Sequence, residues 1–488
     1  MATDTSPLRT LAVKSTAWYG ASRVWGQLVS WGVTVLLARL LVPADYGLFA
    51  MALSVLMVLE LLQEFGLGVA IIQRRNLTRQ QVNGVFWVVT ATSLVLTAAT
   101  FLAAGPISAF YAEPRLTWAL RILCLTFLLN SVGMIPYNLL TKALNLQRRA
   151  VAEGMGTAAA ALIALGLAYM GFGVWSLVLG HLGRAIVLNT ALLIFAGWLP
   201  GLEVARDGMR DVITFGLRIA GMHIVGNISP AVATFIVGRL MGGTALGLYG
   251  MAQSLAEGPH RVSTGILNQV SFPVFAKLQD DREELANYFL KISKYLGLIT
   301  LPAQVGLVLV APDVVPLLLS SKWEAVVVPF QIICVESAVV MMTLTATPLL
   351  TALGRASFML RRSFLSLASM SAATFIGVPF GLAGVALARL TVMIPLRLTL
   401  LVPCLWALEV PFRVYLRTLA SPLLSTAVMA VTVAGVRHVM AESGLWERAV
   451  ASAVVGAVSY VGALLVLDRN LVREVHIMAH DLLSRTKA

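Results

Sequence analysis

The chain has 488 residues, of which 58% are hydrophobic and only 12% are charged, and its formal net charge is +13. A helix needs about 20 mainly apolar residues to cross a bilayer, so this composition indicates a polytopic membrane protein and leaves little room for a soluble domain. The positive charge favours attraction to an anionic inner leaflet rather than nucleic-acid binding, because no basic segment accompanies a soluble fold.

Apolar blocks along the chain predict an all-α integral membrane protein with about fourteen transmembrane helices. In chain order the blocks lie near 15–40, 46–72, 84–109, 117–141, 154–170, 174–197, 212–238, 245–272, 288–310, 326–350, 363–379, 382–405, 418–438 and 447–467. We interpret the first block as a retained span rather than a signal peptide, because it is long, contains Arg23 and lacks a small-residue cleavage site.

Lysine and arginine residues near the ends of the blocks predict the orientation of the helices. With a cytoplasmic N-terminus, most of these residues fall in cytoplasmic loops, and the outside turns hold only Arg39, Arg115, Arg239, Lys322, Arg437 and Arg448. This asymmetry places both termini in the cytoplasm, in agreement with an even number of spans.

The chain contains an internal repeat. Residues 38–54 align without a gap on residues 238–254, and identical residues stand at Arg39/Arg239, Leu40/Leu240, Gly47/Gly247, Leu48/Leu248, Met51/Met251, Ala52/Ala252 and Ser54/Ser254. Further along, Cys124 and residues 139–141 correspond to Cys334 and residues 349–351 at an offset of 210. An offset of six spans gives the two copies the same orientation, as in parallel transporter repeats.

The repeat predicts four parts. These are an N-terminal six-helix lobe (1–200), a C-terminal six-helix lobe (205–408), an extra helix pair (418–467) and a cytoplasmic amphipathic tail (468–488). The tail carries apolar residues at helical spacing beside basic ones, which is typical of an interfacial helix, although a solvated tail is the alternative. Two lobes that face one another are a common transporter plan, so the functional site is expected between them.

Ionisable residues inside the blocks predict a wet interior with a positive charge. They are Arg23, Glu60, Glu64, Arg121, His181, Arg184, Arg218, His223, Glu257, His260, Arg261, Glu336, Arg389 and Arg397. A charge near the bilayer centre costs about 2.5–3.5 kcal/mol even on the lenient insertion scale, so these side chains are expected to face one another rather than lipid. Arginine predominates, and its planar guanidinium group can bind phosphate oxygens through two parallel hydrogen bonds. An anionic cargo is therefore expected.

Two polar stripes occupy equivalent places in the two lobes. The first block carries one at helical spacing: Tyr19, Arg23, Gln27, Ser30 and Thr34. The block 200 residues later carries His223, Asn227 and Thr234, with Arg218 nearer the cytoplasm. These stripes are expected to line opposite walls of one cavity, and burial in lobe packing is the alternative interpretation.

Further candidates lie on the second helix of each lobe. The block 245–272 places Glu257 and either His260 or Arg261 at helical spacing. Glu60 and Glu64 lie one turn apart in the block 46–72, and Glu64 either pairs with Arg23 as a structural ion pair or exchanges a cation during transport. The candidate cavity residues are thus Arg23, Gln27, Arg218, His223, Asn227, His260 and Arg261, and the candidates for ion coupling or ion pairing are Glu60, Glu64 and Glu257.

Catalytic and cofactor signatures are missing from the sequence. There is no G-x-x-x-x-G-K-[ST], H-E-x-x-H or G-x-S-x-G segment. The three cysteines, Cys124, Cys334 and Cys404, lie inside apolar blocks without metal-ligand spacing. We therefore expect a transporter rather than an enzyme, with no cofactor and no metal site.

Two segments carry a resemblance to a known family. ARLLVPADYGLFAMA (38–52) and FGLGVAIIQRRNLTRQQVNGVFW (65–87) closely resemble the polysaccharide-transporter family of oligosaccharide flippases, within the multidrug/oligosaccharidyl-lipid/polysaccharide exporter superfamily. The resemblance extends to the 6+6+2 span pattern. It implies a protein of the bacterial inner membrane that moves undecaprenyl-pyrophosphate-linked oligosaccharide units from the cytoplasmic to the periplasmic leaflet, by alternating opening of two lobes.

The resemblance also implies site residues and partners. Family arginines of the first span and of its second-lobe counterpart correspond to Arg23 and Arg218, whereas the residue 200 positions after Arg23 is His223. Besides membrane lipid and the lipid-linked oligosaccharide, the polymerase and export machinery of such a pathway are candidate partners.

Three other functions compete with this one. A flippase for the peptidoglycan lipid precursor is the second choice, and a cation-coupled drug or metabolite antiporter, which would favour acidic cavity residues, is the third. A polymerase or ligase of the same pathway would need a sizeable external loop, whereas the longest predicted outside segment, near 311–325, is short.

Overall fold

The computed structural model of the chain describes residues 30–64, 66–73, 77–203, 209–267 and 271–468. Over these residues the chain is helical and contains no β-strand, which confirms the expected all-α class. Eleven helical stretches are long and apolar enough to cross a membrane, and a shorter apolar helix, Ser30–Leu40, precedes them. The protein is therefore a multi-pass membrane protein.

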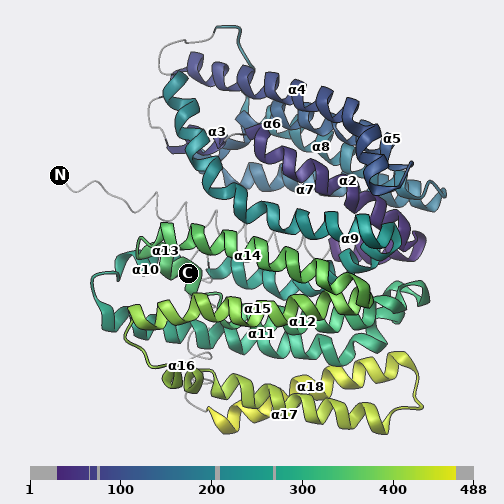
Figure 1. Cartoon of the computed structure of the whole chain (residues 1–488), viewed down its shortest axis with the longest axis vertical. Helices are drawn as coiled ribbons and strands as arrows, with labels where there is room; N and C mark the ends of the chain where they lie inside the picture. The colour runs from purple at the N-terminus through teal and green to yellow at the C-terminus, as the bar shows by residue number, and fades with distance from the viewer. Residues whose placement is uncertain (1–29, 65, 74–76, 204–208, 268–270, 469–488) are drawn as a thin grey trace, which may run out of the picture. The chain divides into compact units, whose positions relative to one another are not determined.

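The chain forms two compact units, Met1–Leu248 and Tyr249–Ala488, and Figure 1 labels their helices. The first unit contains the helix Ser30–Leu40, α2 (Pro43–Glu64), α3 (Leu67–Gln73), α4 (Arg79–Tyr111), α5 (Leu116–Leu123), α6 (Leu125–Lys142), α7 (Leu146–Tyr169), α8 (Val174–Ala196) and the beginning of α9 (Met209–Ile266).

The second unit contains the end of α9 and nine further α-helices. They are α10 (Phe272–Lys277), α11 (Arg282–Leu319), α12 (Val327–Met342), α13 (Ala346–Ala352), α14 (Ala356–Gly377), α15 (Gly381–Ala407), α16 (Phe412–Thr418), α17 (Ala420–Val439) and α18 (Leu445–Leu467), with short 3₁₀ segments η2 (Ser321–Val326) and η3 (Val378–Phe380). The predicted lobe boundaries at 200, 205 and 408 and the extra pair at 418–467 stay a prediction.

Two of the eleven apolar stretches are interrupted at a glycine with positive φ. Within Ile228–Gly258, Gly242 has φ 84° and ψ 175° and so interrupts helix α9. The stretch Ser357–Ala407 contains α14 and α15, which are separated by η3 and by Gly381 at φ 73°. Since only glycine adopts such angles without steric cost, the chain turns at these two places, and the total of fourteen spans stays a prediction.

The internal repeat is visible in matching backbone turns. Helix α6 ends with Leu144 at φ 54°, and α13 ends with Gly354 at φ 70°, 210 residues later. Both turns form the hydrogen-bond pattern of a helix C-cap with a left-handed residue: the amides of Leu144 and Asn145 donate to Thr141 and Leu140 at 3.1 and 2.9 Å, and those of Gly354 and Arg355 donate to Thr351 and Leu350 at 3.1 and 3.0 Å. The offset of 210 therefore relates structurally equivalent residues.

The helix beginnings repeat as well. Thr78 caps α4, because its hydroxyl accepts from the amide of Gln81 at 3.2 Å while the Gln81 side chain accepts from the amide of Thr78 at 3.1 Å. Asp281 caps α11 in the equivalent place and accepts from the amide of Glu284 at 3.0 Å. Such side chains satisfy backbone N–H groups that have no partner inside the helix.

Several predicted boundaries were wrong. The predicted span 46–72 consists of α2 and the short α3, and the span 117–141 is divided between α5 and α6 at Cys124. The predicted outside segment near 311–325 is mostly helical, because α11 continues to Leu319 despite three internal prolines. Asp313, which was not expected inside a helix, is thereby buried in α11.

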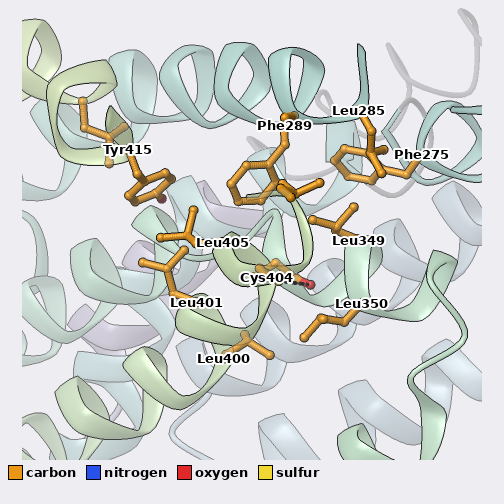
Figure 2. Packing of buried hydrophobic residues seen from close by; sticks show 14 residues of the cluster. Phe275, Leu285, Phe289, Leu349, Leu350, Leu400, Leu401, Cys404, Leu405 and Tyr415 are labelled. Carbon is orange, nitrogen blue, oxygen red and sulfur yellow. Dashed lines mark hydrogen bonds between the residues drawn. The ribbon is translucent and has the colours of Figure 1, made fainter. Parts of the chain in front are cut away.

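A large apolar core lies in the second unit, where α10, α11, α13, α15 and α16 meet. Figure 2 shows the rings of Phe275, Phe289 and Tyr415 on one side of this core and Leu401 and Cys404 on the other. The rings of Phe289 and Tyr415 lie 6.0 Å apart, within the range of favourable aromatic pairs. All three cysteines of the chain are buried and free.

The C-terminal helices α17 and α18 pack against one another and against α11. At one end of the pair, the buried Asp313 of α11 pairs with Arg437 and Arg448 at 2.5 Å each. At the other end, Lys294 of α11 pairs with Asp468 at 2.5 Å. Ion pairs at both ends thus fix the helix pair on α11, with the carboxylate on α11 at one end and the ammonium group on α11 at the other.

Candidate functional site

The repeated motif brings α2 and α9 into backbone contact within the first unit. A Cβ atom at Gly47 would lie 1.7 Å from the carbonyl oxygen of Gly243, and one at Gly247 would lie 1.8 Å from the carbonyl oxygen of Pro43. Pro43 and Gly243, and likewise Gly47 and Gly247, are equivalent residues of the repeat. The contact is therefore reciprocal, and we call these four residues the glycine crossing.

A reciprocal contact is the local signature of a two-fold relation between like segments. Small residues at membrane-helix crossings let backbones approach closely, and dispersion attraction between the tightly packed atoms replaces the hydrophobic driving force, which is absent between helices in lipid. In the sequence the two glycines appeared only as identities of the repeat. The structure gives the reason, because each of them faces the backbone of the other copy.

Aromatic side chains pack beside the glycine crossing. The Tyr111 ring at the end of α4 stacks on Phe235 of α9 with centroids 5.9 Å apart. The Tyr111 hydroxyl lies 3.3 Å from the hydroxyl of Ser54 on α2. A Cβ atom at Gly238 would lie 2.9 Å from the same Tyr111 ring. The end of α4 thus contacts both helices that form the crossing.

The first turn of α2 holds a partly buried ion pair. Asp45 is buried and accepts a hydrogen bond from Arg115 at 3.3 Å. A carboxylate in the first turn also interacts favourably with the helix dipole. This pair therefore fixes the beginning of α2, which supplies Pro43 and Gly47 to the crossing. Arg115 had been counted only as a basic residue of an outside turn.

Thr34 and Thr234, from the two polar stripes, make equivalent hydrogen bonds. The hydroxyl of Thr34 donates to the carbonyl of Ser30 at 2.8 Å, and that of Thr234 donates to the carbonyl of Pro230 at 3.2 Å. Both bonds run to the residue four positions earlier in the same helix. The two stripes thus share a second local feature besides their spacing.

The candidate cavity residues lie outside the part of the chain whose side chains the structure describes. Arg23 and Gln27 lie outside the described residues. Arg218, His223, Asn227, His260 and Arg261 lie on α9, and Glu64 ends α2, but their side chains lie outside the described part of the chain. Glu60 on α2 is half-buried and Glu257 on α9 is exposed. The cavity and the Arg23–Glu64 ion pair stay predictions.

A cluster of arginines in the second unit includes Arg389 and Arg397, which were counted among the ionisable residues inside the blocks but not among the candidate site residues. Arg389 of α15 lies 3.6 Å from Glu336 of α12, and both side chains are at least 86% buried. Arg397, also on α15, interacts electrostatically with Glu336 and with Arg362 of α14. The signal that was available is the pair of arginines inside one apolar run, eight residues apart and therefore about 12 Å apart along the helix.

Metal-ligating side chains do not gather in the described part of the chain. Within those ranges, no group of three or more His, Cys, Asp or Glu side chains could hold a metal ion.

Known sequences that resemble this chain identify its family. Residues 36–328, more than half of the chain, match the family described as polysaccharide biosynthesis protein. The chain belongs to the polysaccharide biosynthesis protein family. This membership confirms the resemblance carried by residues 38–52 and 65–87.

Curated members of this kind are similar at low identity. The lipopolysaccharide biosynthesis protein WzxC of Escherichia coli (strain K12) is 28% identical over 306 residues, 61% of either chain. The succinoglycan biosynthesis transport protein ExoT of Rhizobium meliloti (strain 1021) is 24% identical over 457 residues, 92% of this chain and 91% of ExoT. The present chain thus spans less than two thirds of WzxC and nearly all of ExoT.

Solved structures of membrane transporters share the fold. The lipid II flippase MurJ in an inward closed conformation has a TM-score of 0.74 and 13% identity, over 93% of this chain and all of that chain. A multidrug resistance MATE family transporter in an inward-facing conformation has a TM-score of 0.61 and 15% identity, over 79% and 94%. These likenesses concern the fold alone, and they confirm an all-α membrane-protein fold for this member of the family.

Proposed function

We propose that the protein is a flippase that moves undecaprenyl-pyrophosphate-linked oligosaccharide units from the cytoplasmic to the periplasmic leaflet of the bacterial inner membrane. The units would supply exopolysaccharide, O-antigen or capsule synthesis. The observation that carries the proposal is the similarity to ExoT, named a transport protein of succinoglycan biosynthesis, over 92% of this chain. Similarity over nearly the whole length includes both copies of the repeat, which a two-lobed transporter requires.

The glycine crossing supports alternating access as the mechanism. Pro43–Gly47 belongs to the predicted first lobe and Gly243–Gly247 to the predicted second lobe, so their reciprocal contact would be a junction that two like lobes can close and open in a symmetric manner. Gly242, with its non-helical backbone, lies directly beside this junction, as a residue that absorbs rotation would. By the basic-residue asymmetry, the junction belongs to the periplasmic side, and both termini lie in the cytoplasm.

The candidate cavity would hold the diphosphate of the cargo. Arg23 is the first-lobe contact that we favour, with Gln27 one turn away, and Arg218 and Arg261 are the second-lobe contacts that we favour over His223. A neutral imidazole binds phosphate weakly at pH 7. Transport rather than catalysis follows from this assignment, and the polymerase and export machinery that use the flipped units are the expected partners.

The test measures the leaflet in which the lipid-linked unit accumulates. Deletion of the gene should leave the sugar units inaccessible to a membrane-impermeant periplasmic probe, and the wild-type chain should restore access. Arg23→Ala should abolish restoration at near-normal protein abundance, and Arg23→Lys should restore part of it. Equal accessibility with and without the protein would refute the proposal, whereas loss of peptidoglycan precursor instead would identify the alternative flippase.

A further inference from the structure

Four helices of the second unit surround a group of charged side chains in the middle of an apolar bundle. Arg362 lies on α14, Arg389 and Arg397 lie on α15, and Glu336 lies on α12. Tyr249 at the beginning of the unit interacts electrostatically with Arg389 and Glu336. The neighbouring side chains are apolar, because Met370, Met393 and Leu396 form a buried cluster with Val340 and Val392.

The charges of this group do not balance. The group contains three guanidinium groups and a single carboxylate, and the ion pair between Arg389 and Glu336 is long at 3.6 Å. Charge-assisted hydrogen bonds of this kind normally measure about 2.7–2.9 Å. Arg362 donates to the backbone carbonyl of Leu396, the residue before Arg397, and like charges close together are unfavourable in an apolar interior. Two guanidinium groups held together in this way favour an anion between them.

The arginines also keep hydrogen-bond donors to spare. The Nε atoms of Arg362 and Arg389 are buried and have no hydrogen-bond partner among the described residues. Arg362 donates through Nη2 to the carbonyl of Leu396 at 3.2 Å, and Arg397 donates to the sulfur of Met393 at 3.4 Å. A thioether is a weak acceptor. Each guanidinium carries five N–H donors, so these bonds satisfy only a small part of the group.

A second buried carboxylate of the same unit shows the contrast. Asp313 also pairs with two arginines, and both ion pairs are short at 2.5 Å. Arg448 also donates to Asp313 through Nε at 2.7 Å. The same arginines further donate to the backbone carbonyls of Leu309 and Ala441. The Asp313 group therefore uses its donors within the protein, and its two arginines lie in the last turn of α17 and the first turn of α18. Its role is structural, whereas the Glu336 group leaves donors unused.

We propose that Arg362 and Arg397 form a phosphate-binding site of the second unit, and that this site takes the diphosphate of a polyprenyl carrier lipid. The proposal rests on the proposed flippase function and adds a site outside the cavity residues named above. Guanidinium groups bind phosphate oxygens in pairs, and a diphosphate diester carries two negative charges. These match the excess of three arginines over one glutamate.

Glu336 acts in this site as an internal competitor. Its carboxylate interacts with both Arg389 and Arg397. The carboxylate and the ligand therefore compete for the guanidinium group of Arg397. Binding of a diphosphate would leave Glu336 to Arg389 alone. Removal of the Glu336 charge is therefore expected to tighten binding, whereas a merely structural ion pair would give no such increase.

The test measures binding of farnesyl diphosphate to the purified full-length chain in phosphatidylcholine nanodiscs. Arg362→Gln and Arg397→Gln should each weaken binding about tenfold or more, because each removes charged hydrogen bonds to phosphate, and Arg397→Lys should weaken it less. Glu336→Gln should tighten binding several-fold. Arg361→Gln is the matched control, since Arg361 is the exposed neighbour of Arg362 on the same helix, and it should leave the affinity unchanged.

Further arms identify the ligand chemistry. Inorganic pyrophosphate should compete, while farnesol and added phosphatidylglycerol should not; displacement by phosphatidylglycerol would mean a site for bulk lipid headgroups and would overturn the proposal. Thermal melting without ligand identifies any variant that fails to fold. If the wild-type chain binds farnesyl diphosphate and the folded Arg362 and Arg397 variants bind it equally well, this site is wrong and the flippase function stands. Absence of wild-type binding would contradict both.

Discussion

Replacement of Gly47 by alanine tests the glycine crossing directly. The added Cβ would lie 1.7 Å from the carbonyl oxygen of Gly243 and 2.5 Å from its carbonyl carbon. In Gly247→Ala it would lie 1.8 Å from the carbonyl oxygen of Pro43. Ordinary contacts begin near 3.4 Å, and the obstructing atoms are backbone. The two helices must therefore separate by about 1.5 Å or more, since no side chain can rotate away.

Overpacking of this kind costs about 1–3 kcal/mol, and occasionally more. Alanine is also favoured over glycine by about 0.5–1 kcal/mol inside a helix, so a matched glycine is needed. Gly243→Ala is the control within the glycine crossing, because its Cβ would meet nothing nearer than 3.8 Å. Gly250→Ala is a second control on α9, because its Cβ would meet no atom within 4 Å. Gly47→Ala should be less stable than either control by about 1–3 kcal/mol.

The assay is SDS titration of the purified chain in mixed micelles, with polymer export in cells as a second measurement. Gly47→Ala and Gly247→Ala should lower the unfolding midpoint and reduce export, and the double variant should lose less than the sum because both changes separate the same helices. Stability of Gly47→Ala equal to or above that of Gly243→Ala would refute the close backbone contact. Normal export with a lowered midpoint would refute its role in transport.

Three further outcomes follow from the described contacts. Asp313→Asn should lower the unfolding free energy by about 3–5 kcal/mol, because it leaves buried arginines without their carboxylate, whereas the exposed Asp280→Asn should change it little in the same SDS titration. Gln63→Leu should cost about 1–3 kcal/mol, because the buried amide donates to a serine hydroxyl at 2.9 Å and to a backbone carbonyl at 2.7 Å; equal midpoints would contradict this. A maleimide should label Ser357→Cys only from the cytoplasm and Ser443→Cys only from outside, without background because the native cysteines are buried. Labelling of both from one side would refute the predicted topology.

Helices and the repeat could be predicted because their causes are local. Apolar length identifies a span, and the identical residues within 39–54 and 239–254 identify the copies. The turns at Leu144 and Gly354 show that the repeat includes backbone conformation. The offset of 210, found from cysteine and leucine identities, also relates these two left-handed residues, whose turns form the same hydrogen bonds. The backbone thus repeats more closely than the sequence does.

Partners of charged residues could not be predicted in the same way. Helical spacing says which residues share a face, but it does not say what lies opposite. Asp313 was expected in an outside segment near 311–325; here α11 continues to Leu319 and the aspartate is buried against two arginines of another helix pair. Arg362, counted among loop residues, lies on α14 beside Arg397.

The arginines of this protein divide into two kinds according to their acceptors. Those that fix helices reach a carboxylate at short range, as Arg437 and Arg448 do around Asp313. Arg362 instead donates to the backbone carbonyl of Leu396, and Arg397 donates to the thioether of Met393. Such an arrangement does little for folding, because a charged group in apolar surroundings is costly when no opposite charge is close to it. Arginines that do not stabilise the fold are available to bind an anionic cargo. Replacing arginines of this second kind should weaken diphosphate binding, whereas Glu336→Gln should tighten it.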